Sequence, residues 1–155
     1  MVNTIENKLA SLGIDLPPAV TPFGPYVTAA QTGSLLFLSG MLPTVGHEPK
    51  FVGRVGKELN VEQARSAARA AALNALAVAK AHLGSLDTIS RVVRLGVYIA
   101  TTGEPADLVR IADGASELLR DVFGEEKMSA RAVLGVASLP FNTPVELEAI
   151  FERSE

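Results

Sequence analysis

The sequence predicts an α+β fold in which a mixed β-sheet is covered on one face by two long helices. Two segments with helical periodicity, 60–83 and 105–123, enclose an alternating apolar strand at 89–100. Further strands occur in pairs before the first of these helices and after the second, so strands and helices do not alternate strictly. The 155 residues, 48% of them hydrophobic, suffice for a single domain spanning 1–155 whose core needs no disulfide.

The first part of the chain predicts a short helix, a hairpin and a loop. Apolar residues at helical spacing predict the helix at 3–12, and Gly13 is typical of a position just after a helix end. Runs of β-forming residues at 26–31 and 35–39 flank a glycine-containing turn and predict a β-hairpin. The segment 43–57 is rich in glycine, proline and charge, which predicts a loop with at most a short strand.

Both long helices carry recognisable end signals. Asn60 followed by Gln63 predicts a capping box at the start of the first, and Gly84 predicts its end. The second is predicted from Pro105 to Phe123, with proline in its first turn. Gly114 is its weak point, since glycine in a helix interior costs about 1 kcal/mol relative to alanine.

Two final strands, 130–139 and 145–152, are predicted to form a hairpin around a short turn. Alternation turns Glu146 and Glu148 away from the helices. We expect Arg131, in the strand before, to contribute to that same open face. A face that mixes apolar and charged side chains is typical of a subunit interface with a polar site set into it.

Composition excludes several classes of function. The chain has no cysteine, which removes a disulfide framework, a thiolate nucleophile and an iron–sulfur cluster. A net charge of -3 with scattered charges provides no basic stripe for nucleic acid. No apolar run approaches the roughly 18 residues that cross a bilayer, and the first residues do not resemble a signal peptide. We therefore expect a cytoplasmic protein with neither nucleic acid nor membrane as a partner.

Candidate catalytic groups are few. The two histidines, His47 and His82, lack metal-ligand spacing, and no phosphate-binding glycine loop is present. Arg131 is the conspicuous residue, because a guanidinium inside an apolar strand keeps its charge and requires a carboxylate. That carboxylate comes either from the protein, in a structural ion pair, or from a ligand.

Three stretches share a characteristic order and spacing from about residue 23 to the end. They are Gly24-Pro25-Tyr26, Leu38-Ser39-Gly40-Met41-Leu42-Pro43, and Ala130-Arg131-Ala132-Val133 continuing through Leu139-Pro140 to Val145-Glu146-Leu147-Glu148-Ala149-Ile150. In this pattern the chain resembles the Rid family, also called YjgF or endoribonuclease L-PSP. The resemblance implies a chorismate-mutase-like (bacillus-type) subunit in a barrel-like homotrimer with clefts between subunits. The extra helix at 3–12 and the segment 113–116 resemble a longer branch of the family.

The resemblance also implies an enamine/imine deaminase that converts 2-aminoacrylate-like intermediates to 2-keto acids and ammonia, with no metal or organic cofactor. Matched residue by residue, Arg131 would hold the substrate carboxylate and Glu146 would position the attacking water. Five further matches would bind the substrate: Tyr26, Ser39, Gly40, the backbone carbonyl of Val133, and Asp113, where many members carry Asn.

Besides Asp113, two further departures and one geometric conflict bear on this assignment. Val133 stands where the family often has Cys, and Met41 where Gln is common. The predicted hairpin places Arg131 opposite Glu152, so its pairing with Glu146 needs another register or a neighbouring chain. A non-catalytic trimer that binds small carboxylate metabolites is the main alternative, and the acidic composition disfavours ribonuclease activity.

Overall fold

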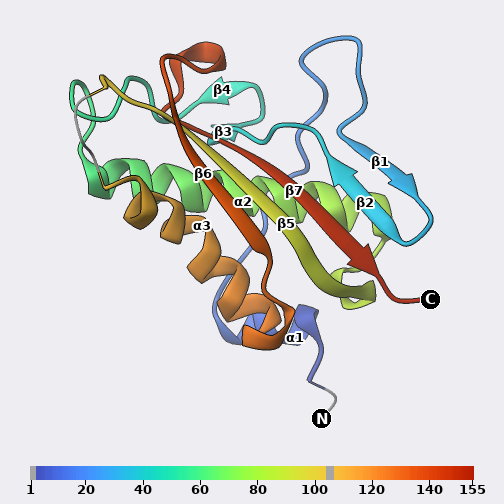
Figure 1. The fold of residues 1–155 in the computed structure, drawn as a ribbon. Coiled ribbons are helices and arrows are strands. Elements are labelled where there is room, and N and C mark those ends of the chain that lie inside the picture. Colours follow the sequence, from blue (N-terminus) through green and yellow to red (C-terminus); the bar gives the residue numbers. More distant parts are fainter. Residues whose placement is uncertain (1–2, 104–106) are drawn as a thin grey trace.

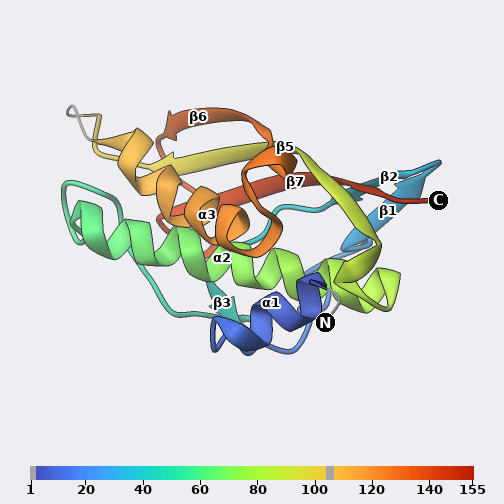
Figure 2. The same cartoon turned by 90° about the horizontal axis from the view of Figure 1, so that it is seen from below.

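The computed structural model describes residues 3–103 and 107–155 and has two layers (Figure 1). The first is a mixed five-stranded sheet in the order β1-β2-β7-β5-β6. Its strands are β1 (Ala29–Thr32), β2 (Leu35–Leu38), β5 (Ile89–Ala100), β6 (Ala130–Val136) and β7 (Val145–Arg153). The helices are α1 (Ile5–Ser11), α2 (Val61–Leu83) and α3 (Leu108–Phe123), and Figure 2 shows them all on one side of the sheet. The short strands β3 (Thr44–Val45) and β4 (Glu48–Pro49) pair separately.

The local end signals are confirmed in most places. Asn60 and Gln63 form the predicted capping box of α2, which ends at Gly84. The strands β1 and β2 pair as the predicted antiparallel hairpin. The second long helix begins at Leu108, after its N-cap Asp107, whereas the predicted start at Pro105 lies outside the described residues.

The prediction that the last two strands form a hairpin is wrong. β6 pairs in parallel with β5, and β7 pairs antiparallel with the other edge of β5. Arg131 is therefore level with Leu95 in β5, and Leu95 is level with Ala149 in β7, so Arg131 does not lie opposite Glu152.

The connection from β6 to β7 crosses the end of β5, and the backbone of β5 is hydrogen-bonded to the chain before and after this connection. The backbone NH of Thr101 donates to the Val136 carbonyl at 3.0 Å, and that of Ala100 donates to the Pro144 carbonyl at 2.9 Å. The end of β5 thus hydrogen-bonds to the chain on both sides, and the segment that looks like a turn in the sequence is a crossover between its two edges.

The core lies between the sheet and the helices. In β7 the residues Val145, Leu147, Ala149 and Phe151 are buried, as the alternation predicts. Alanines of α2 are fully buried against the sheet and α3, which allows the layers to approach closely. The opposite face of the sheet carries no helix among the described residues (Figure 1).

Gly114 marks the contact between α2 and α3, and we expect Gly114→Ala to lower the free energy of unfolding by about 1–2 kcal/mol. A Cβ at this position would overlap the backbone carbonyl oxygen of Arg65, so the helices would have to separate. Overpacking of about 1–3 kcal/mol exceeds the gain of about 1 kcal/mol in helix propensity. Urea denaturation measures the change, with Val109→Ala on the exposed side of α3 as the control. A Gly114→Ala variant as stable as the wild type would contradict this packing.

Candidate functional site

Arg131 extends from β6 toward α3. Its Nη1 donates to Asp113 Oδ1 at 2.8 Å and to Ser116 Oγ at 3.1 Å. Asp113 and Ser116 are three residues apart on α3, so one helical turn places both side chains beside the guanidinium. The Arg131 side chain remains 24% exposed and that of Asp113 38%. We call Asp113, Ser116 and Arg131 the edge cluster, because β6 is an edge strand of the sheet.

The prediction that Arg131 shares the open face with Glu146 is wrong. Arg131 is level with Leu95 of β5 and Glu146 is level with Tyr98 of the same strand. An odd separation along a strand places side chains on opposite faces, so Arg131 lies on the helical side and Glu146 on the open side. Which face each side chain occupies depends on how β6 and β7 pair with β5, and this pairing cannot be deduced from the sequence of either strand.

Glu146 lies against the chain just after β2. Gly40 packs there directly, and a Cβ at position 40 would overlap Glu146 Oε1. Ser39 Oγ is buried and has no hydrogen-bond partner in the part of the chain that the structure describes. The resemblance implies that Gly40 binds the substrate, and in the structure its missing side chain makes room for a carboxylate. We call Ser39, Gly40 and Glu146 the face cluster.

The surroundings of Glu146 in the face cluster raise its pKa. Burial raises the pKa of Glu146 above its ordinary value, and the nearby negative charge of Glu148 raises it further. The Tyr98 hydroxyl donates a hydrogen bond to Glu148 Oε1, and this bond raises the pKa of Tyr98. A carboxyl with a raised pKa is better matched to proton transfer near neutral pH than an ordinary one.

The sequence did not identify Tyr98 and Ser116 as neighbours of the predicted site. Tyr98 lies beside Glu146 only because β5 is inserted between β6 and β7. Ser116 carried a local signal, since it follows Asp113 by one helical turn.

The two clusters are far apart within one chain. Arg131 and Glu146 lie on strands separated by β5 and at levels three residues apart. These offsets correspond to about 10 Å across the sheet and about 10 Å along it. A small ligand of a few atoms therefore cannot contact both side chains of a single chain.

Tyr26 belongs to neither cluster. Its hydroxyl accepts a hydrogen bond from the backbone NH of Phe23 at 2.9 Å. The Phe23 ring stacks on His47, with centroids 4.1 Å apart, and also contacts Phe141. His47 Nε2 further lies 3.0 Å from Thr21 Oγ1, so this histidine has a structural role in a loop contact.

Val133 is part of the edge strand two residues after Arg131. Its side chain packs against the core, on the helical side of the sheet. The Val136 carbonyl points toward the end of β5, where it accepts from Thr101. Because carbonyl directions alternate along a strand, the carbonyl of Val133 is directed to the outer edge of β6, away from β5.

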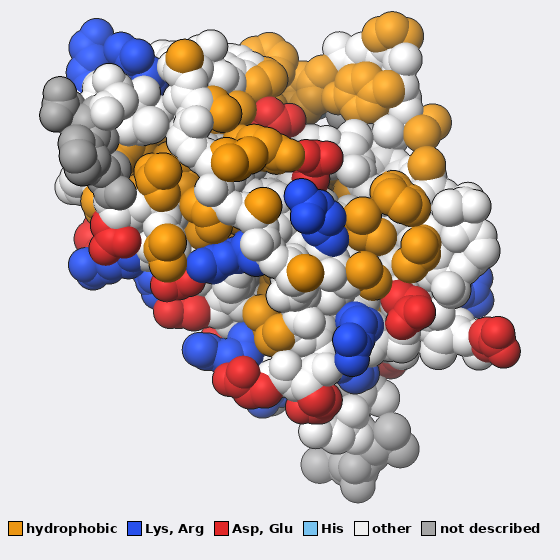
Figure 3. Space-filling view, in the orientation of Figure 1, with side chains coloured by type: hydrophobic (Ala, Val, Ile, Leu, Met, Phe, Trp, Pro, Cys, Tyr) orange, Lys and Arg blue, Asp and Glu red, His pale blue; other side chains and the backbone are white. Residues whose placement is uncertain are grey.

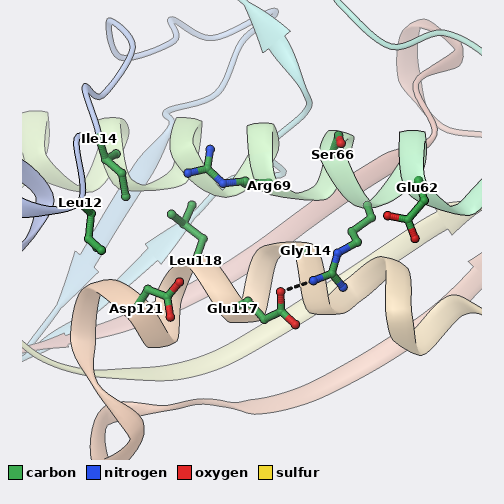
Figure 4. A pocket seen from close by; sticks show the side chains of 10 residues that line it. Leu12, Ile14, Glu62, Ser66, Arg69, Gly114, Glu117, Leu118 and Asp121 are labelled. Carbon is green, nitrogen blue, oxygen red and sulfur yellow. Dashed lines mark hydrogen bonds and ion pairs between the residues drawn. The ribbon is translucent and has the colours of Figure 1, made fainter.

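Two of the pockets near the helices share Glu117 of α3. One, of about 390 Å³, is lined by the edge cluster together with Glu117, Arg120, Glu125, Met128 and Ser129. The other, of about 360 Å³, lies between α2 and α3 and the segment after α1 (Figure 4). Its Glu117 is already paired with Arg65, and it contains none of the predicted site residues.

The open face of the sheet combines apolar and charged side chains, as the sequence predicted for the face of Glu146. Phe37 and Leu134 are 40% and 51% exposed, and the exposed Arg94 and Glu148 lie on the same face. Figure 3 shows apolar patches interrupted by both signs of charge over these strands.

Among the helices of the described residues, none has the length and apolar character needed to cross a membrane.

Comparison with known proteins places this architecture in a family. The model of the family described as YjgF/chorismate mutase-like matches residues 6–152. The protein TCP17 of Trypanosoma cruzi is 40% identical over 149 residues, which cover 96% of this chain and 93% of that protein. A 2-iminobutanoate/2-iminopropanoate deaminase of Dermatophagoides farinae is 32% identical over 137 residues, covering 88% and 92%. A solved structure of a protein of unknown function from Agrobacterium tumefaciens is 40% identical, with a TM-score of 0.88 over 97% of this chain and 92% of that one. The chain belongs to the YjgF/chorismate mutase-like family.

Proposed function

We propose that the protein is an enamine/imine deaminase that hydrolyses 2-aminoacrylate-like intermediates to 2-keto acids and ammonia. The observation that carries the proposal is Glu146, a half-buried carboxyl of raised pKa with no hydrogen-bond or ion-pair partner in residues 3–103 and 107–155. Such a group is free to hold a water molecule and accept its proton. The similarity to a relative named as an imine deaminase supports the same reaction class.

The chemistry needs few groups. The enamine tautomerises to a 2-imino acid, whose carboxylate binds the guanidinium of Arg131. With the imine nitrogen already protonated, Glu146 takes one proton from water as the oxygen attacks C2 and the C=N π electrons move to nitrogen, which gives a neutral carbinolamine. Glu146 then returns that proton to the amino nitrogen, the C–N bond breaks as ammonia leaves, and the hydroxyl proton passes to the Glu146 carboxylate as the C2 carbonyl forms. The Val133 carbonyl at the outer edge of β6 accepts an N–H of the substrate, and Ser39 and Tyr26 line the site.

The reaction requires more than one copy of the chain. Arg131 and Glu146 lie on opposite faces of the sheet and about 10 Å apart in each of two directions, so the proposal brings the edge cluster of one subunit to the face cluster of its neighbour. The exposed Phe37 and Leu134 on the open face supply apolar surface for such contacts. We propose a homotrimer, the assembly that the family resemblance implies.

A coupled assay tests the function. A pyridoxal-phosphate-dependent dehydratase generates 2-aminoacrylate, and the release of pyruvate is followed with and without this protein. We expect release to be faster than spontaneous hydrolysis. Absence of acceleration across several side chains would overturn the proposal.

One observation favours a second candidate, a non-catalytic binder of small carboxylates. The pocket of about 390 Å³ beside Arg131 offers a guanidinium to a carboxylate but does not include Glu146. A binder predicts saturable carboxylate binding that depends on Arg131, together with no hydrolysis.

A further inference from the structure

We propose that Asp113 makes the edge cluster selective for ligands that carry both a carboxylate and a positively charged nitrogen. The favoured ligand class is the zwitterion, meaning a 2-imino acid protonated on nitrogen or an α-amino acid. The disfavoured class is the simple 2-keto acid anion. The inference rests on the proposed function in one respect, the use of Arg131 as the carboxylate site.

The geometry leaves half of the guanidinium available. Asp113 Oδ1 and Ser116 Oγ both bind Nη1 of Arg131. The Nε and Nη2 edge forms no hydrogen bond with the described residues, and neither does Asp113 Oδ2. A carboxylate can therefore bind this free edge through two parallel N–H donors, while Oδ2 accepts from an adjacent ligand nitrogen.

The other charged side chains around the pocket are paired with one another or with residues outside it. Arg120 lies 3.8 Å from Glu125 and 3.6 Å from Asp121, and Glu117 is paired with Arg65. The charge that a ligand meets at the free guanidinium edge is thus set by Arg131 and Asp113 together. Their charges cancel, so a bare anion gains little net attraction and lies close to a second carboxylate.

A zwitterion has the opposite pattern of charges. Its carboxylate faces Arg131 and its cationic nitrogen faces Asp113, so both contacts are attractive and no charge is left unmatched. Protonation of the imine nitrogen also makes C2 more electrophilic toward water. After hydrolysis the nitrogen departs as ammonia, the keto acid retains only its carboxylate, and the lost contact to Asp113 favours product release.

Direct binding tests the inference without turnover. Isothermal titration compares L-alanine, the zwitterion, with pyruvate, the anion, on the wild type and on Asp113→Asn, which keeps the size and the acceptor oxygen but removes the charge. We expect the wild type to prefer alanine. In the variant we expect pyruvate affinity to rise about 10-fold and alanine affinity to fall by a similar factor. Ser116→Ala is the matched control, because it removes the neutral contact to the same Nη1 and should keep the preference.

The possible results separate this inference from the proposed function. A wild type that binds neither ligand, or binds pyruvate as tightly as alanine, overturns the inference, as does an Asp113→Asn variant with an unchanged preference. Imine hydrolysis can persist in each of these cases. Conversely, a preference for alanine that disappears in Asp113→Asn supports the inference even where the coupled assay detects no hydrolysis.

Discussion

Replacement of Arg131 with alanine is expected to lower kcat/KM for imine hydrolysis by about 10²- to 10⁴-fold. The guanidinium would form two charge-assisted hydrogen bonds to the substrate carboxylate, each contributing about 1.5–3 kcal/mol. The same change removes the partner of Asp113, whose side chain is 38% exposed and can therefore be solvated. Keto-acid release at several substrate concentrations measures the loss.

Arg131→Lys is the matched control for this change. Lysine keeps the positive charge but cannot present two parallel donors, so we expect activity between that of the wild type and that of Arg131→Ala. Circular dichroism of each variant checks that the fold is retained. If Arg131→Ala hydrolysed imines at the wild-type rate, the carboxylate site would have to lie elsewhere.

Replacement of Glu146 with glutamine is expected to lower kcat by about 10²- to 10⁴-fold, since an amide cannot accept the proton of the attacking water. Ligand binding should change little, because the proposal assigns the substrate carboxylate to Arg131. Glu146→Gln should also raise the melting temperature at neutral pH. In the wild type the pKa of Glu146 is higher in the folded state than in the unfolded state. The protonated carboxyl therefore contributes to the free energy of unfolding below the ordinary carboxyl pKa, and this contribution is lost as pH rises through the pKa of the folded state. The difference in melting temperature should disappear in acid.

Glu148→Gln is the control for Glu146→Gln. Removing this neighbouring negative charge should bring the pKa of Glu146 down toward its ordinary value, so hydrolysis persists and its acid limb moves to lower pH. An unchanged kcat in Glu146→Gln would remove the water-positioning role from this residue.

Mixing the two inactive variants tests whether neighbouring subunits share a site. In trimers reassembled from equal amounts of Arg131→Ala and Glu146→Gln chains, about one quarter of the sites would combine an intact Arg131 with an intact Glu146. Activity should therefore return in the mixture. No recovery after demonstrated subunit exchange would contradict the shared arrangement.

The sequence predicts those features of the fold that depend on neighbouring residues. The capping box of Asn60 and Gln63 and the buried face of β7 follow from local spacing, and both are confirmed. The apparent hairpin fails because the strand inserted between its arms, β5, ends about 30 residues before the first arm begins. For the same reason, the face on which Arg131 lies could not be deduced, since its parity relative to Glu146 depends on pairing with β5. The resemblance implies roles for both side chains but does not indicate their separation within one chain.

Position 40 requires glycine because of the rotamer of Glu146, not because of its own backbone conformation. Gly40 is not among the glycines with positive φ, so an alanine could adopt its backbone without strain. The added Cβ would instead meet the flexible end of Glu146 and displace the carboxylate, with little consequence for folding. Positions 40 and 146 are therefore coupled. A side chain at position 40 fits without displacing its neighbour only when the residue at position 146 is shorter than glutamate. A stability screen would accept Gly40→Ala as neutral, whereas an activity screen would reject it.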